Sequence, residues 1–368
     1  MRILITAPSL DESENVSGIS TVVRQIINSS NLHFVHFVAG KKDTEKRRFG
    51  WFLRQFILLF RFYREAKKVD IVHINTALNT LSILRDFFLV SIAKVADKRI
   101  LLHVHGGNFL AVCEFPSFLL KKIAEKMLAK ADVVLVLSRR EKEILESKFS
   151  GLRKVLFLEN SVEVDESISI EKKPNSVIFL GRLEESKGLR ELAEAMKILT
   201  SDPTLSFTLR VFGAGTLEKD FVSEMKRTLG ERFYFGGVVS GEKKIHELAK
   251  SDIFVLPSRY GEGLPMAMLE AMAYECIVVV SEMASVGEVV VDGVNGFLIQ
   301  PHNINLLVEK LKNILKADEE FKQSLRRNAR ETVKSKFNLN SYIQRLERIY
   351  REELKLESKD LAHENTRK

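Results

Sequence analysis

The chain has 368 residues, of which 45% are hydrophobic and 29% are charged, and its formal net charge is +8. This length is sufficient for two ordinary domains with full cores, and the composition is ordinary for a globular protein. Two cysteines, Cys113 and Cys276, are too few for a disulfide framework or a cysteine metal cluster, and they indicate a reducing compartment.

The positive charge excess lies entirely in the N-terminal half. Residues 1–165 contain 26 Lys and Arg against 18 Asp and Glu, whereas residues 166–368 contain 31 of each. We therefore expect an anionic surface or partner for the first half. No segment reaches the roughly 18 unbroken apolar residues that span a bilayer, and Met1–Pro8 has the pattern of a first strand instead of a signal peptide.

Short apolar strands alternate with helical stretches along the chain. In the first half the expected strands are Ile3–Ala7, His33–Val38, Asp70–Ile74, Ile100–Val104, Val133–Leu137 and Val155–Leu158, with helices near 18–29, 51–67, 80–96, 117–130 and 139–149. In the second half the expected strands are Val177–Gly181, Thr208–Phe212, Phe233–Phe235, Ile253–Leu256, Ile277–Val280 and Phe297–Ile299, again with helices between them. This alternation predicts parallel sheets whose two faces are covered by helices.

We therefore predict an α/β protein with two doubly wound, Rossmann-like domains. The polar stretch Glu163–Ser176, which contains Pro174, is the expected linker. The predicted domains are residues 1–165 and 166–337. Residues 338–368 are expected to form a helix followed by a charged tail that frays.

The segment Pro257–Ala273 places two carboxylates, Glu262 and Glu270, eight positions apart. The residues that lead from the loop into the helix are Gly263, Leu264, Pro265 and Met266. Free amides at such a helix start can hold an anion, and Glu270, about two turns further along, can accept hydrogen bonds from sugar hydroxyls. Two glutamates at this spacing are usually solvated, but here the flanking strands place the loop at the ligand-binding edge of a sheet.

Two cations, Arg182 and Lys187, lie in the expected strand-to-helix loop that follows Gly181. An arginine fork beside a lysine charge suits a diphosphate. Either cation alone would be interpreted as an ordinary surface residue, but both in one loop at this edge favour a ligand.

Three weaker candidates follow other expected strands. Gly213 and Gly215 form either a tight turn or a close approach to a ligand, and without a third glycine they predict no NAD binding. Gly18 has the same two interpretations. His105 ends a strand before two glycines and either is structural or contacts a ligand, and alternation places it on the same face as His103. No zinc arrangement and no D-x-D pair is present, so we expect no metal and no cofactor.

Together these motifs resemble those of the group 1 glycosyl transferases, which are retaining, nucleotide-sugar-dependent enzymes of the GT-B fold. The matching residues are Glu262 and Glu270 in S-x-x-x-E-G-x-P-x-x-x-L-E-A-M-A, Gly181-Arg182 with Lys187-Gly188, Gly213-Ala214-Gly215, His105-Gly106, and Asn160 at the domain join. The resemblance covers nearly the whole chain, and its specific motifs lie in the C-terminal half. It implies two Rossmann-like domains that face a central cleft, with the last helix crossing back to the first domain.

The resemblance also implies residue roles. Arg182 and Lys187 would bind the donor diphosphate and stabilise the leaving group, Glu262 would bind the transferred sugar, and Glu270 the ribose hydroxyls. His105 would contact the donor sugar near the reaction centre. Further implied donor contacts are the amides of Gly263 to Met266, Gly18 at the phosphate, Val239 at the base, and Gly213, Gly215 and Asn160. No carboxylate nucleophile is evident, so a covalent intermediate and a front-face path both remain open.

Four positions depart from the family pattern. Ser17-Gly18 replaces a common Gly-Gly, and Asn160-Ser161-Val162-Glu163 replaces Asn-Gly-Val-Asp. Glu275 stands where a glycine usually follows the helix, and Ile277 where a proline usually opens the next strand. The last two positions are structural and do not affect the expected catalysis.

Residues 41–68 combine ten Lys and Arg and three Asp and Glu with bulky aromatic residues. The cations at positions 47, 54, 61 and 68 recur every seven residues and would form a basic stripe on a helix. This pattern is typical of an interfacial helix on anionic lipid, although its apolar side could instead pack on the sheet. We favour the membrane interpretation, with a cytoplasmic enzyme that is peripheral on the inner face of the cell membrane.

The function predicted from the sequence is metal-independent transfer of a hexosyl or N-acetylhexosaminyl group from a nucleotide sugar. UDP is favoured over GDP by its frequency in the family, and the expected acceptor is a lipid-linked saccharide in polysaccharide or lipopolysaccharide assembly. The alternatives are a soluble transferase that makes a small glycoside, and a non-catalytic nucleotide-sugar-binding protein on the same scaffold. No nucleic-acid-binding motif is present.

Overall fold

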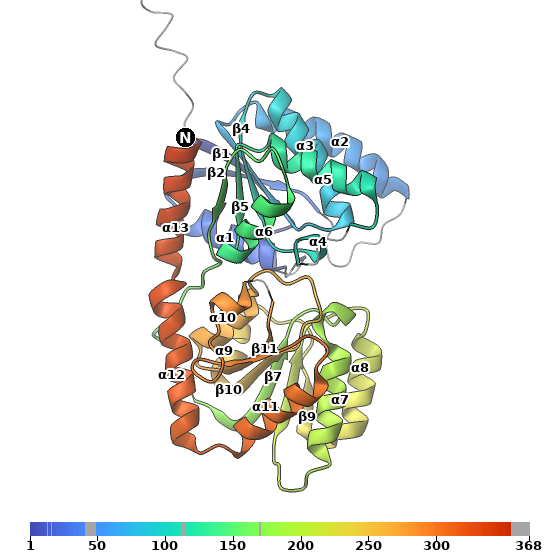
Figure 1. Ribbon diagram of the computed structural model, residues 1–368, viewed down its shortest axis with the longest axis vertical. Helices are drawn as coiled ribbons and strands as arrows, with labels where there is room; N and C mark the ends of the chain where they lie inside the picture. Colours follow the sequence, from blue (N-terminus) through green and yellow to red (C-terminus); the bar gives the residue numbers. More distant parts are fainter. Residues whose placement is uncertain are drawn as a thin grey trace, which may run out of the picture. The chain divides into compact units, whose positions relative to one another are not determined.

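The computed structural model describes residues 1–12, 14–15, 17–40, 49–111, 115–168, 171–283 and 285–354, with the backbone alone for residues 49–56, 108 and 111 (Figure 1). The chain divides into two compact units. Unit 1 consists of Met1–His105, Cys113–Leu158 and Asn340–Lys368, and unit 2 consists of Gly106–Val112 and Glu159–Leu339. Cys276 is a buried free thiol, and Cys113 lies outside the described residues.

Unit 1 is built on a parallel sheet of six strands. In spatial order they are β2 (His33–Val38), β1 (Arg2–Ala7), β3 (Ile71–Thr76), β4 (Arg99–Val104), β5 (Val133–Val136) and β6 (Val155–Phe157). The helices between them are α1 (Gly18–Ser29), α2 (Phe49–Ala66), α3 (Thr80–Val95), α5 (Phe118–Lys130) and α6 (Arg139–Lys148). β3 and β5 are buried along their whole length because helices cover both faces of the sheet (Figure 1).

The C-terminal helix packs on unit 1, as predicted. Helix α13 (Leu339–Arg348) continues into the π-helical turn Ile349–Glu353. The Ser30 hydroxyl donates to Glu347 at 2.6 Å, and the buried Tyr350 hydroxyl lies 2.6 Å from Nδ1 of His73 on β3. The predicted charged tail, residues 355–368, lies outside the described residues.

Unit 2 repeats the architecture of unit 1. Its parallel sheet has the order β12 (Phe297–Ile299), β11 (Ile277–Ser281), β10 (Ser251–Leu256), β7 (Lys173–Leu180), β8 (Thr208–Phe212) and β9 (Phe233–Phe235). Its helices are α4 (Asn108–Ala111), α7 (Leu189–Thr200), α8 (Glu218–Leu229), α9 (Gly241–Lys250), α10 (Met266–Ala273), α11 (Ile304–Lys316) and α12 (Glu319–Lys336). Two doubly wound sheets confirm the predicted fold class.

Two details differ from the sequence predictions. The predicted linker was too long at its C-terminal end, because β7 already begins at Lys173. Pro174 is tolerated there because the ladder with β10 shifts register between Ser251 and Ile253, so the missing N–H falls at an irregularity. The short helix α4 was not predicted. Glu275 has φ +59°, which explains why a glycine is favoured at this position.

Candidate active site

Two loops of unit 2 lie against each other at the carboxyl edge of its sheet. One follows β7 and the other follows β10, and these adjacent strands are where the strand order reverses, the usual ligand position in doubly wound sheets. Gly188 in the first loop has φ +71°, and a Cβ there would lie 1.8 Å from the Pro257 carbonyl oxygen. The Arg259 amide donates to the Ser186 carbonyl at 2.8 Å. The sequence-predicted cation loop and carboxylate loop therefore touch.

An ion pair between Lys187 and Glu262 links the side chains of the two loops. The Lys187 ammonium donates to Oε1 of Glu262, and the Ser258 hydroxyl donates to the same oxygen at 2.7 Å. Both side chains of the ion pair are mostly buried. Because an ammonium has three donors, Lys187 can hold Glu262 and still bind an anion.

Glu270 projects from α10 and is bonded by a lysine that the sequence analysis missed. Nζ of Lys244, on α9, lies 2.6 Å from Oε1 of Glu270, whose residue is buried. A carboxylate offers about four acceptor sites, so this bond leaves capacity for sugar hydroxyls. Lys244 follows another lysine in a polar helix, and no pattern in the sequence marks it.

Arg182 is exposed at the end of β7, and the structure gives it no hydrogen bond or ion pair with any residue it describes. Its loop is supported by the two glycines of the G-x-G segment. A Cβ at Gly213 would lie 1.8 Å from the Gly181 carbonyl oxygen, and one at Gly215 would lie 2.3 Å from that of Leu183. The fixed backbone leaves the guanidinium available for an anion.

The loop that enters α10 is held by two other segments of unit 2. The amide nitrogen of the buried Asn160 donates to the Leu264 carbonyl at 2.8 Å, and a Cβ at Gly106 would lie 2.5 Å from the Gly263 nitrogen. Pro265 caps the helix with φ −65°, so the first helical amides begin at Met266. The residues around Glu262 are therefore fixed in position, as an anion-binding helix start requires.

His105 lies at the corresponding carboxyl edge of unit 1. The amide nitrogen of Asn75 donates to the Thr6 carbonyl at 2.9 Å, so its oxygen faces Nε2 of His105 at 2.7 Å. Nε2 must then carry the proton, which leaves Nδ1 as an acceptor. Asn75 was not predicted, although a polar residue at the end of an apolar strand is a usable signal. Next to the predicted Gly18, the Ser17 side chain caps α1 by accepting a hydrogen bond from the Ser20 amide. Val239, in unit 2, is buried in the segment of the chain that connects β9 to α9.

Three histidine rings form a column inside unit 1. The rings of His103 and His105 are 4.0 Å apart, as their predicted common face implies, and His73 is 5.5 Å from His103. Burial lowers the pKa of His73 and of His105 to about 3, and it lowers the pKa of His103 well below its usual value. His105 is therefore neutral at pH 7 and acts as a hydrogen-bonding group.

Acidification should destabilise the protein through this column. The unfolded chain binds protons below pH 6.5, whereas folded His73 and His105 bind them only near pH 3. Stability is therefore complete above pH 6.5 and falls as the pH decreases toward 3, by about 1.4 kcal/mol per histidine per pH unit. Urea unfolding at pH 7, 6 and 5 measures this slope. His103→Phe should flatten it, while the exposed control His33→Phe should not, and equal slopes in all three proteins would contradict the argument.

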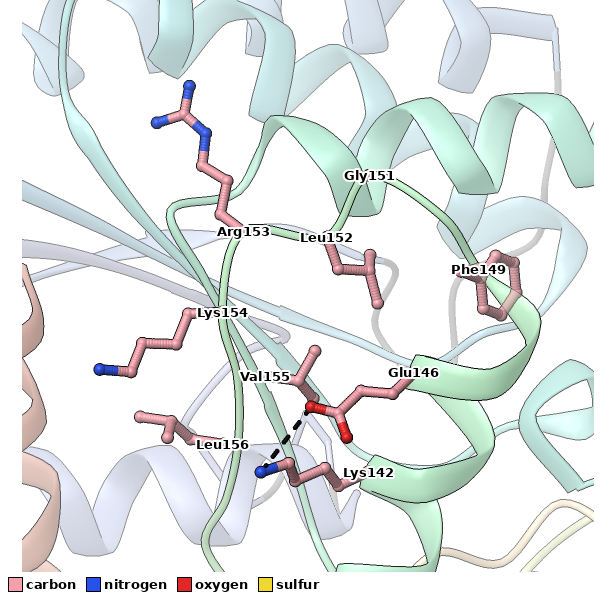
Figure 2. A pocket seen from close by; sticks show the side chains of 9 residues that line it. All are labelled: Lys142, Glu146, Phe149, Gly151, Leu152, Arg153, Lys154, Val155 and Leu156. Atoms are coloured by element: carbon pink, nitrogen blue, oxygen red, sulfur yellow. Dashed lines mark ion pairs between the residues drawn. The ribbon is translucent and has the colours of Figure 1, made fainter.

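A separate pocket of about 410 Å³ lies beside α6 and β6 in unit 1 (Figure 2). It is lined by Lys142, Glu146, Phe149, Gly151, Leu152, Arg153, Lys154, Val155 and Leu156. Its three cations each have a carboxylate partner: Lys142 pairs with Glu146, Arg153 with Asp132 and Lys154 with Glu353. None of the sequence-predicted site residues lines it.

The described part of the chain contains no group of three or more His, Cys, Asp or Glu residues placed to hold a metal ion. Among the same residues, none of the helices combines enough length with enough apolar character to cross a bilayer.

The two Rossmann-like units define the class of protein, which is the GT-B fold. Solved structures of this fold match nearly the whole chain. Sucrose-phosphate synthase from Thermosynechococcus elongatus superposes with a TM-score of 0.75 at 18% identity, covering 95% of this chain and 98% of the other. HepE from Anabaena in complex with UDP gives 0.73 at 18% identity, covering 94% and 98%.

Residues 161–332 match the family described as glycosyl transferases group 1, and this segment of the chain belongs to that family. The uncharacterized glycosyltransferase MJ1069 of Methanocaldococcus jannaschii is 27% identical over 69% of this chain and 68% of its own length. The capsular polysaccharide biosynthesis glycosyltransferase CapM of Staphylococcus aureus is 23% identical over 66% of each chain. A Campylobacter jejuni enzyme, named as an α-1,4-N-acetyl-D-galactosaminyltransferase acting on an undecaprenol-linked glycan, is 28% identical over 50% of this chain and 51% of its own.

Proposed function

We propose that this glycosyltransferase moves a hexosyl or N-acetylhexosaminyl group, with retention, from a UDP-sugar to a lipid-linked saccharide. The observation that carries the proposal is the junction of two loops at the carboxyl edge of unit 2. Arg182 and Lys187 lie in one loop, Glu262 lies in the other, and Lys187 bonds Glu262 directly. The solved complex of HepE with UDP supports the choice of nucleotide.

In this mechanism the protein stabilises charge where it develops. Glycosyl transfer passes through an oxocarbenium-like state while the nucleoside diphosphate departs with negative charge. The Arg182 fork and the Lys187 ammonium meet that charge in place of a metal ion. Glu262, fixed by Lys187 and Ser258, binds the transferred sugar, and Glu270 binds the ribose hydroxyls. Nδ1 of His105 accepts a hydrogen bond from a sugar hydroxyl.

The lipid-linked acceptor is supported by the name of the Campylobacter relative and by the basic character of the N-terminal half. With such an acceptor, the proposed enzyme would work at the inner face of the cell membrane, in polysaccharide or lipopolysaccharide assembly. The predicted membrane segment 41–68 is only partly described: residues 41–48 lie outside the described residues, and only the backbone is described for residues 49–56.

Thermal unfolding with UDP, GDP or ADP, each in buffer containing EDTA, tests the donor site. A ligand that binds only the folded state stabilises it by about 2.7 kcal/mol at a hundredfold excess over Kd. UDP should raise the Tm without metal, and Glu270→Ala should abolish this rise. The matched control is Glu247→Ala, because Glu247 pairs with Arg210 at 2.5 Å with burial similar to that of the Lys244–Glu270 pair.

Four results would contradict parts of the proposal. A shift with GDP or ADP alone would change the donor, and a shift that appears only when metal replaces EDTA would overturn metal independence. No shift with any nucleotide and no hydrolysis of UDP-sugars would indicate a non-catalytic protein on this scaffold. Transfer to a small soluble acceptor in place of a lipid-linked one would support the small-glycoside alternative.

A further inference from the structure

Three neighbouring helices of unit 1 expose an unusual number of apolar side chains. Helix α3 contacts both α2 and α5, and the three lie side by side on one face of the sheet (Figure 1). We call this surface the α2–α3–α5 face. Its exposed large apolar residues are Ile57 and Phe60 on α2, Leu81, Leu84, Phe88 and Val95 on α3, and Phe118 and Leu119 on α5. Exposed apolar side chains that gather on adjacent helices in this way are typical of an interaction site.

The apolar residues of α3 form a second stripe in addition to its core stripe. Leu81, Leu84, Phe88 and Val95 are spaced by three, four and seven residues, which places them on one side of the helix. Ile83 and Leu89 are fully buried on the side that faces the sheet. Side chains such as Val95 and Phe118, which are 78% and 75% exposed, make no contribution to the core. Burial in the core therefore accounts for the stripe of α3 that faces the sheet, but not for the exposed stripe.

The charges on the same helices are predominantly positive. Arg61 and Arg64 on α2 and Lys121 and Lys126 on α5 are exposed, and none of them forms an ion pair with a side chain that the structure describes. The acidic residues of these helices are already neutralised by neighbours. Glu65 pairs with Lys68, Glu125 with Lys122, and the buried Asp86 with Arg85. The free charge of the face is therefore cationic, which fits an anionic partner.

We infer that the α2–α3–α5 face docks on an anionic lipid bilayer. The apolar side chains enter the boundary between headgroups and acyl chains, and the cations contact lipid phosphates. A single lysine side chain can serve both regions, as Lys122 does by placing its ammonium 5.4 Å from the Phe118 ring centroid. From sequence alone, lipid binding is expected only for residues 41–68; the exposed apolar residues of α3 and α5 extend the proposed surface.

This inference extends the proposed function by naming the surface that brings unit 1 to a lipid-linked acceptor. Flotation with phosphatidylcholine vesicles, with and without about a third of phosphatidylglycerol, tests it in the absence of donor and acceptor. The full chain should bind the anionic vesicles, and added salt should weaken binding. Because no sugar substrate is involved, failure of vesicle binding is distinct from failure of glycosyl transfer, which is followed by UDP-sugar hydrolysis.

Two pairs of variants test the two components of the face. Phe118→Ser with Leu119→Ser removes apolar side chains that are exposed, so folding should be retained, and binding to anionic vesicles should fall at least about tenfold. Its control is Ile198→Ser with Phe321→Ser, which removes exposed apolar side chains from unit 2. Lys121→Glu with Lys126→Glu should also weaken binding at least about tenfold, whereas Lys226→Glu with Arg227→Glu on α8 should not.

Three results would overturn the inference. The first is wild-type protein that does not float with anionic vesicles. The second is a Phe118→Ser and Leu119→Ser variant that floats as well as wild type. The third is a wild-type dimer that becomes a monomer in this variant without any vesicle binding. That result would assign the face to a second copy of the chain.

Discussion

Arg182→Ala is expected to lower kcat by about 10²- to 10³-fold, the usual effect of removing one preorganised group from developing transition-state charge. Arg182 is exposed and forms no bond with any residue that the structure describes, so its guanidinium is available to the diphosphate. Lys187, in contrast, already bonds Glu262. Charge on the diphosphate grows as the sugar departs, so kcat should fall more than KM for the donor rises. Steady-state hydrolysis or transfer of the UDP-sugar measures both constants.

Two further variants separate charge from geometry. Arg182→Lys keeps the charge but loses the planar fork, so it should recover only part of the lost rate. Arg190→Ala removes an exposed arginine from α7 and should leave kcat unchanged. Because Arg182 has no hydrogen-bond or ion-pair partner among the residues that the structure describes, its alanine variant should unfold at the wild-type temperature. A kcat within threefold of wild type would show that another group meets the diphosphate charge.

The sequence specified the strands well because most of them are apolar runs with abrupt polar ends. Thr208–Phe212 and Phe233–Phe235 match the observed β8 and β9, since each run is followed by glycine and cannot be extended. The linker was predicted less well because Pro174 suggests a loop. Pro174 can lie in β7 because the pairing of β7 with β10 shifts register there. This shift is a property of the strand pair and cannot be read from the sequence around Pro174.

In the candidate site, too, local sequence predicts some features, whereas others depend on how neighbouring elements pack. The position of Arg182, Lys187 and Glu262 at one sheet edge could be predicted, because each lies in a loop that follows a strand and parallel strands bring such loops to the same edge. Glu270 follows in the helix that the second loop enters. Lys244 could not be predicted, because its bond to Glu270 depends on how α9 packs against α10. Local sequence does not determine such a contact between helices.

Gly188→Ala is expected to destabilise unit 2 by about 2–5 kcal/mol and to reduce activity as well. A side chain in the left-handed region costs about 1–2 kcal/mol, and forcing extra volume into a packed site costs about 1–3 kcal/mol more. Both apply here, because Gly188 has φ +71° and its Cβ would lie 1.8 Å from the Pro257 carbonyl oxygen. Relieving the clash must separate the loop of Lys187 from that of Glu262. Urea unfolding and UDP-sugar hydrolysis measure the two effects.

Gly293→Ala is the control that separates the clash from the backbone strain. Gly293 has φ +75°, and a Cβ there would meet nothing within 4 Å, so only the cost of the left-handed conformation, about 1–2 kcal/mol, should remain. Gly293 also lies outside the two site loops, so hydrolysis should be unaffected. If both variants lowered the free energy of unfolding equally, the loops of Lys187 and Glu262 would move apart to make room for the Cβ without a loss of stability. In that case the contact between Gly188 and Pro257 would not be what holds the Arg182 and Glu262 loops together, and a folded Gly188→Ala protein should keep wild-type kcat.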